Sequence, residues 1–152
     1  MSDLHQVFPQ LVPLAIEWAE RVAAQAAAAG THLTAEQARI ARQVGVASPG
    51  KVRLFISEAF PCPEHPLLRS AAVQTGMLGP GMAGLTLGHT IFLAGPPSLR
   101  LLSHELRHVA QYEAAGSIAA FLPSYLAQIL HFGYEDAPYE VDARHHEIHA
   151  EP

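Results

Sequence analysis

Two histidines one helical turn apart in an apolar segment constrain this chain more than any other feature of its sequence. His104 and His108 flank the tripeptide Glu105-Leu106-Arg107, and the positions around them are apolar: Leu101, Leu102, Val109 and Ala110. On an α-helix, side chains at i and i+4 project from one face, so the segment predicts a buried helix that carries two imidazoles side by side. Buried polar groups need partners. We therefore expect either a metal ion held by the two rings or core histidines satisfied by hydrogen bonds.

A histidine pair at this spacing, with a glutamate directly after the first ring, is typical of a zinc site. Glu105 is rotated by about 100° from His104 around the helix axis, so it can reach a zinc-bound water without ligating the metal. That is the position of a catalytic base. A catalytic zinc needs a third protein ligand, and Glu140 is the best candidate. The alternative for Glu140 is a surface ion pair with Arg144 at i,i+4 spacing.

The segment from Thr86 to Arg144 resembles the gluzincin metallopeptidases, and especially small bacterial proteins with an HExxH motif. In these proteins a strand precedes His-Glu-x-x-His-Val-x-Gln, which is His104 to Gln111 here. A Gly-Tyr-x-x-x-Pro-x-Glu element follows, which is Gly133 to Glu140 here. The resemblance covers the second half of the chain and leaves the N-terminal third without a counterpart.

The resemblance implies a zincin-like domain with Glu105 as catalytic base and three zinc ligands: His104, His108 and Glu140. The chain departs from the better-known members, because a whole helix separates the HExxH segment from the downstream glutamate. Arg144 also stands where some gluzincins carry an acid that orients a ligand histidine. Asp142 is an alternative source of that hydrogen bond, although its helical phase argues against it.

Several other polar side chains are candidates for the site. The hydroxyl of Tyr134 or Tyr139 could stabilise an oxyanion, and the alternative is ordinary packing. We interpret His131, which has apolar neighbours, as a core histidine rather than a site residue. A C-terminal cluster is interpreted as a solvated tail and not as a second metal site: His145, His146 and His149.

The order of the predicted elements is helices, a few strands, then helices, which indicates an α+β domain, mostly helical, with a small sheet or hairpin before the HExxH helix. We expect helices over Val12–Ala29, Thr34–Val44, Leu99–Ala115, Ser117–Phe132 and Asp136–His149. We expect strands over Lys51–Phe60 and Gly84–Ala94, with a loop over 61–83 that holds one helical turn near Leu67–Val73. Residues 1–152 form a single domain in this prediction, with N-terminal helices over 1–45 and a metal-site core over 51–152.

The composition favours a folded protein without a strongly charged binding surface. The hydrophobic fraction is 49% and the net charge is -5, without a basic cluster that would bind nucleic acid. Cys62 is the only cysteine, so no intrachain disulfide forms, and we interpret it as structural. No secretory signal is visible at the start, so we expect a cytoplasmic location. The uncharged stretch Ala114–Tyr134 is interrupted by Gly116 and Pro123, and we expect a buried helical layer that returns to the HExxH helix.

Hydrolysis of a peptide bond by a zinc-activated water is the leading hypothesis, with a peptide or protein as substrate and Zn²⁺ as cofactor. The strand Leu85–Leu93 would offer an edge to extended substrate. A catalytically silent zinc-binding scaffold that keeps the zincin core is the rival hypothesis, because the chain has little length for a full substrate cleft. A membrane-associated module that uses Ala114–Tyr134 is the third.

Overall fold

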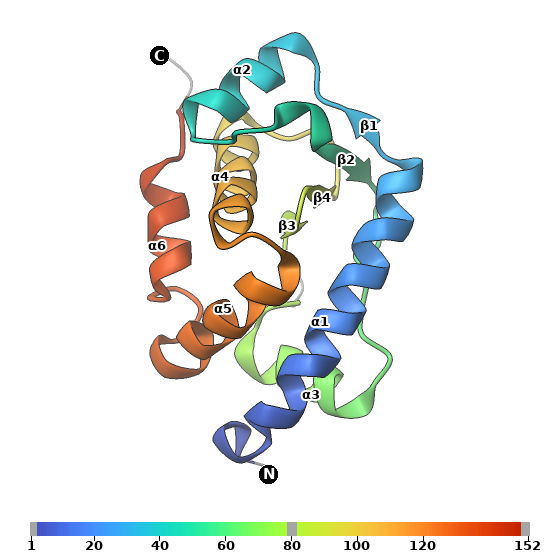
Figure 1. Cartoon of the computed structure of the whole chain (residues 1–152), viewed down its shortest axis with the longest axis vertical. Helices are drawn as coiled ribbons and strands as arrows, with labels where there is room; N and C mark the ends of the chain where they lie inside the picture. The colour runs from blue at the N-terminus through green and yellow to red at the C-terminus, as the bar shows by residue number, and fades with distance from the viewer. Residues whose placement is uncertain (1–2, 79–81, 150–152) are drawn as a thin grey trace.

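The computed structural model describes residues 3–78 and 82–149 and confirms an α+β fold, largely helical with one small mixed sheet (Figure 1). The elements follow in the order α1 (Leu4–Ala29), β1 (Thr31–His32), α2 (Ala35–Gln43), η1 (Pro49–Lys51), β2 (Arg53–Ile56), α3 (Pro66–Thr75), β3 (Gly84–Leu87), β4 (Thr90–Leu93), α4 (Leu99–Ala115), α5 (Ile118–Phe132) and α6 (Pro138–His145). Helix α1 runs along one side of the molecule and α6 along the other, with α4 between them.

The sheet has the order β1-β2-β4-β3, with β2 parallel to β4 and the two outer pairs antiparallel. The single strand predicted over Gly84–Ala94 is wrong, because this segment is a hairpin. The chain reverses at Gly88, whose φ of +66° is a conformation that favours glycine, and Leu87 then pairs with Thr90. Strand β3 is therefore an edge strand of the sheet.

Three helices differ from the predicted boundaries by more than one residue. Helix α6 (Pro138–His145) ends before the predicted limit at His149, because the backbone leaves the helix after the C-cap residue His146. Helix α1 begins at Leu4 and not at Val12, since it accommodates Pro9 and Pro13 in its interior despite the backbone hydrogen bonds that proline removes. Helix α3 has ten residues where one helical turn was predicted within a loop. Helix α2 begins with a capping box, in which the Thr34 side chain and the Gln37 side chain are each bonded to the other residue's backbone.

Helix α4 lies between two hydrophobic clusters. The first is formed with α2, β2 and β4, where Leu106 and Val109 are fully buried. The second is formed by α1, the β3–β4 hairpin and α5, and Tyr112 and Phe121 belong to it. Because both sides of α4 are packed, the face that carries His104 and His108 is held in a fixed orientation toward α6.

Within the part of the chain that the structure describes, no single helix is long and apolar enough to cross a membrane. Helices α4 and α5 pass that test only as a pair, by length and composition, and they are bent by 116° relative to each other. The bend follows Gly116, whose φ is +107°. The chain then returns through α5, so that α6 packs against α4 as predicted.

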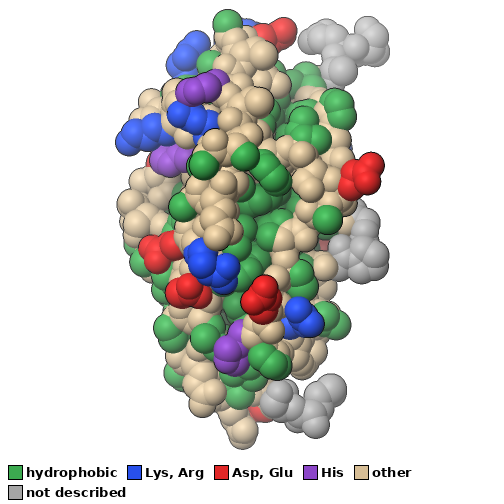
Figure 2. Space-filling model, turned by 90° about the vertical axis from the view of Figure 1, so that its right-hand side faces the viewer, with side chains coloured by type: hydrophobic (Ala, Val, Ile, Leu, Met, Phe, Trp, Pro, Cys, Tyr) green, Lys and Arg blue, Asp and Glu red, His purple; other side chains and the backbone are tan. Residues whose placement is uncertain are grey.

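The surface is of mixed charge where Figure 2 shows it. On this face hydrophobic side chains gather in the middle, and acidic and basic groups are interspersed around them. This face therefore offers no continuous basic area of the kind that binds nucleic acid.

Candidate metal centre

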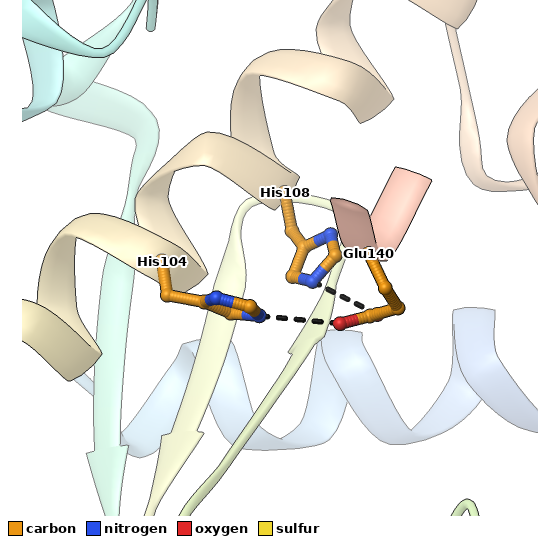
Figure 3. A group of neighbouring side chains, drawn as sticks. All are labelled: His104, His108 and Glu140. Carbon is orange, nitrogen blue, oxygen red and sulfur yellow. Dashed lines mark hydrogen bonds and ion pairs between the residues drawn. The ribbon is translucent and has the colours of Figure 1, made fainter. Parts of the chain in front are cut away.

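Helix α4 begins and ends where its sequence predicts. Ser98 accepts a hydrogen bond from the Leu101 amide at 3.1 Å and caps the start, and Gly116 follows the last residue. His104 and His108 lie on consecutive turns, with ring centroids 4.9 Å apart. Both point toward Glu140, which comes from α6 (Figure 3).

The three predicted ligands converge on one point. The Nε2 atom of His104 lies 3.2 Å from Oε1 of Glu140, and Nε2 of His108 lies 3.1 Å from Oε2. One ligand atom from each residue lies within 4.8 Å of the other two. Around a tetrahedral zinc with ligands at 2.0–2.1 Å, neighbouring ligand atoms are about 3.3 Å apart. The distances from the two Nε2 atoms to the Glu140 oxygens are therefore close to those between the ligands of a zinc site.

The tautomer of His108 follows from its neighbour Gln111. The Gln111 amide nitrogen donates to the Tyr139 carbonyl at 2.9 Å and to an Asp142 carboxylate oxygen at 2.8 Å, both of which only accept. Its Oε1 therefore faces Nδ1 of His108, at 2.8 Å, and that nitrogen carries a hydrogen. The lone pair of Nε2 is left to face Glu140, as in a metal-ligating histidine.

His104 is oriented in the same way by a residue that the sequence did not point to. Its Nδ1 lies 2.8 Å from an oxygen of Glu147, in the segment after α6. This segment is anchored by the Ile148 amide, which donates to the Ser103 hydroxyl at 2.8 Å. Asp142, considered for this role, acts instead on His108 through Gln111. The two ring nitrogens of His104 face two carboxylates, Glu147 and Glu140, and an ionised carboxylate only accepts hydrogen bonds. Because a neutral ring has a hydrogen on only one nitrogen, a metal ion or an added proton is needed between the ring and Glu140.

Glu140 is buried, with 2% of its surface exposed. The predicted alternative, a surface ion pair with Arg144, is wrong: Arg144 donates to the carbonyl of Glu135 instead. Tyr125 donates to Oε2 of Glu140 at 2.8 Å, a contact that sequence reasoning missed. Glu140 is therefore held by α4 and α5 together, in a position where a metal ion or a protonated histidine ring would balance its charge.

The protonation of the cluster reflects this geometry. Burial alone would lower the pKa of both histidines, but the hydrogen bond to Glu140 and the negative charges of Glu140 and Glu105 outweigh it and raise the pKa of His108 to about 9. Burial would raise the pKa of Glu140, yet its hydrogen bonds with both rings hold that pKa well below its usual range. Without a metal, protons thus occupy the place between rings and carboxylate.

Glu105 lies beside this group but does not join it. Its Oε1 accepts a hydrogen bond from the Thr86 hydroxyl at 2.9 Å. The rest of the carboxyl group lies against β3, where a Cβ on Gly84 would come within 3.0 Å of it. Strand β3 thus lies against the side chain that the sequence predicts as catalytic base, and a side chain at position 84 would require Glu105 to shift.

Two hollows meet at this site. One is an open hollow of about 320 Å³ lined by His104, Glu105, Tyr134 and Arg100, among others. The other is an apolar cavity of about 130 Å³ whose lining includes Glu105, His108 and Glu140. The predicted base and ligands are therefore accessible to a small molecule despite their burial.

Of the two tyrosines considered for the site, the structure brings one to it. Tyr134 lines both hollows, and burial together with the charges of Glu140 and Glu105 raises its pKa well above the usual range, so it remains a donor. The Tyr139 ring packs against Phe121, with centroids 4.7 Å apart, and it does not line either hollow. Tyr125 occupies the place beside Glu140 instead.

The remaining candidates do not belong to the cluster of His104, His108 and Glu140, which we call the metal group. His131 is exposed on α5, so its interpretation as a core histidine is wrong. His145 and His149 are exposed at the C-terminal end, in agreement with a solvated tail, whereas His146 is half-buried and its Nδ1 lies 2.8 Å from the carbonyl oxygen of Asp142. Cys62 is a free thiol.

No protein-family model, curated protein or solved structure matches this chain.

The hydrogen bond from His104 to Glu147 gives a first prediction. Replacing Glu147 with glutamine should lower the affinity for zinc by about 10- to 100-fold, the usual effect of removing a carboxylate that orients a ligand histidine. A matched control is Glu113→Gln, which alters a similar pair with His89 (2.9 Å) far from the metal group. Competition with a chromophoric chelator measures both affinities, and equal values for the two variants would contradict the role of Glu147.

The raised pKa of His108 gives a second prediction, for metal-free protein. Between pH 6.5 and about 9 the folded state binds more protons at this ring than the unfolded state does, so the free energy of unfolding should fall as the pH rises through this window. Urea unfolding at pH 6 and pH 9 measures it. The fall should be smaller in Glu140→Gln, which lacks the charge that raises this pKa, and an unchanged fall would show that other groups cause it.

Proposed function

We propose that this chain is a zinc-dependent metallopeptidase of the gluzincin type, which hydrolyses a peptide or related amide bond. The observation that carries the proposal is the convergence of three ligand atoms whose other hydrogen bonds are already made: each Nδ1 is committed to a second residue, and each Nε2 faces Glu140. Two histidines and one glutamate with an open fourth position are the ligand set of catalytic zinc sites. The cytoplasmic location expected from the sequence is part of this proposal.

The residues of the site divide the chemical work among them. Zinc, when bound, lowers the pKa of a water molecule and polarises a carbonyl group. Glu105 takes a proton from the attacking water and delivers it to the leaving amine. The Tyr134 hydroxyl, which stays protonated, donates to the oxygen on which negative charge develops. The edge strand β3, against which Glu105 packs, is the place where an extended substrate can add as a further strand.

Metal analysis of the purified protein tests the proposal. We expect about one zinc per chain in the wild type and none in His104→Ala, because two remaining ligands hold zinc poorly. His131→Ala is the matched control, since this histidine is exposed on α5. Full zinc content in His104→Ala would place the metal elsewhere and contradict the proposed site.

A further inference from the structure

The cavity beside the metal group has an unusual distribution of polarity. It lies between α1, α3, β3, α4 and α5, and its described lining contains no lysine, arginine or aspartate. Most polar groups of the lining are gathered around Glu105, His108, Tyr134 and Glu140. Outside this group, the Thr75 hydroxyl is already bonded to the Ala71 carbonyl, at 2.8 Å, and the Trp18 indole adds a mainly apolar ring. A ligand would therefore present a polar group to the metal centre and mainly hydrocarbon to the rest.

The cavity is long as well as apolar. Along α1 it is lined by residues from Leu4 to Ala19, which at 1.5 Å per residue is about 22 Å of helix. A compact cavity of about 150 Å³ accepts one benzene ring. The volume of about 130 Å³ found here, extended along such a wall, leaves a narrow channel. This shape suits a linear chain better than a ring.

We propose that the cavity binds an unbranched acyl chain whose carbonyl lies at the metal centre. The preferred substrate is then an N-acylated amine or peptide, and this part of the inference rests on the proposed function. In the reaction, the oxygen of water bonds to the acyl carbonyl carbon and the C–N bond breaks. The proton that Glu105 takes from water goes to the amine, and a fatty acid and a free amine are released.

Binding of saturated carboxylates of two, four, six and eight carbons to zinc-loaded and zinc-free protein tests the cavity without any hydrolysis. Each added methylene that is buried should raise the affinity about fourfold, until the channel is full. Titration calorimetry below the micelle concentrations measures this series. An affinity that does not depend on chain length would overturn the proposal.

Neighbouring positions on α3 offer a matched pair of variants. Ala72 lines the cavity, whereas Val73 is 73% exposed and does not. Ala72→Phe should remove the gain from chain length beyond the shorter acids, and Val73→Phe should keep it. Ala71→Leu, a smaller change in the same wall, serves if Ala72→Phe does not fold. Equal chain-length dependence in the cavity and surface variants would show that the chains bind elsewhere.

Hydrolysis separates failure of the cavity from failure of the proposed function. With zinc-loaded protein, N-hexanoylglycine amide should be cleaved faster than N-acetylglycine amide and faster than an acetylated peptide with leucine or phenylalanine. Chain-dependent binding without cleavage of any substrate would contradict the peptidase proposal and leave the cavity assignment standing. Cleavage of the leucine or phenylalanine peptide in preference to the hexanoyl amide would overturn the acyl chain as occupant and support the enzyme.

Discussion

Replacing Glu105 with glutamine is expected to lower kcat by about 10²- to 10⁴-fold while zinc remains bound, because the change removes a general base and no metal ligand. Glutamine has nearly the same shape, and it can still accept the hydrogen bond that Thr86 donates at 2.9 Å. The contact with Gly84 is also preserved. Turnover of an amide substrate, measured with the zinc content of the same samples, tests the assignment.

Two results of this experiment would count against the account. Loss of zinc in Glu105→Gln would make this residue a ligand, and activity equal to that of the wild type would exclude it as the base. A wild-type protein that binds zinc and cleaves nothing in a broad peptide and acyl-amide collection would favour the scaffold hypothesis. Glu113→Gln, on the same helix but bonded to His89, is the control for unspecific effects of the substitution.

Replacing Glu140 with alanine should reduce zinc affinity by more than about 100-fold, which exceeds the effect of removing an outer residue that only orients a ligand. The buried rings of His104 and His108 lose the charge that raises the pKa of both, and Tyr125 loses its acceptor. Chelator competition measures the affinity. Glu135→Ala, exposed in the turn before α6, is the control. Retention of wild-type affinity by Glu140→Ala would exclude the proposed third ligand.

Local signals explain which parts of the fold could be predicted. The limits of α4 are set by Ser98 and Gly116, residues next to the helix in sequence, and both limits were correct. The hairpin was missed because only Gly88 and His89 separate β3 from β4, and the residues on both sides of this short turn are rich in strand-forming types. The length of α3 was underestimated, since only one helical turn was predicted, because the helix lies between segments rich in proline and glycine and none of its residues is buried, although Pro66 at its first position is a start signal.

In the site, as in the fold, features set by neighbouring residues could be predicted from the sequence, whereas contacts made by tertiary packing could not. His104 and His108 are one turn apart on a single helix, so their pairing could be read from spacing. Glu140 was reached through motif order, and the return of the chain that brings it to α4 was expected from Gly116 and Pro123, of which only Gly116 marks a change of direction, since Pro123 lies inside α5. Tyr125 and Glu147 could not be found, since each contacts the metal group only through tertiary packing of segments with no motif of their own.

Anomalous diffraction at the zinc edge from zinc-loaded crystals tests the central claim most directly. The account predicts one strong peak, about 2.0–2.2 Å from Nε2 of His104, Nε2 of His108 and a carboxylate oxygen of Glu140, with a fourth position open toward Glu105. A peak bound by the exposed His145 and His149 instead, or no peak at the three predicted ligands, would contradict it.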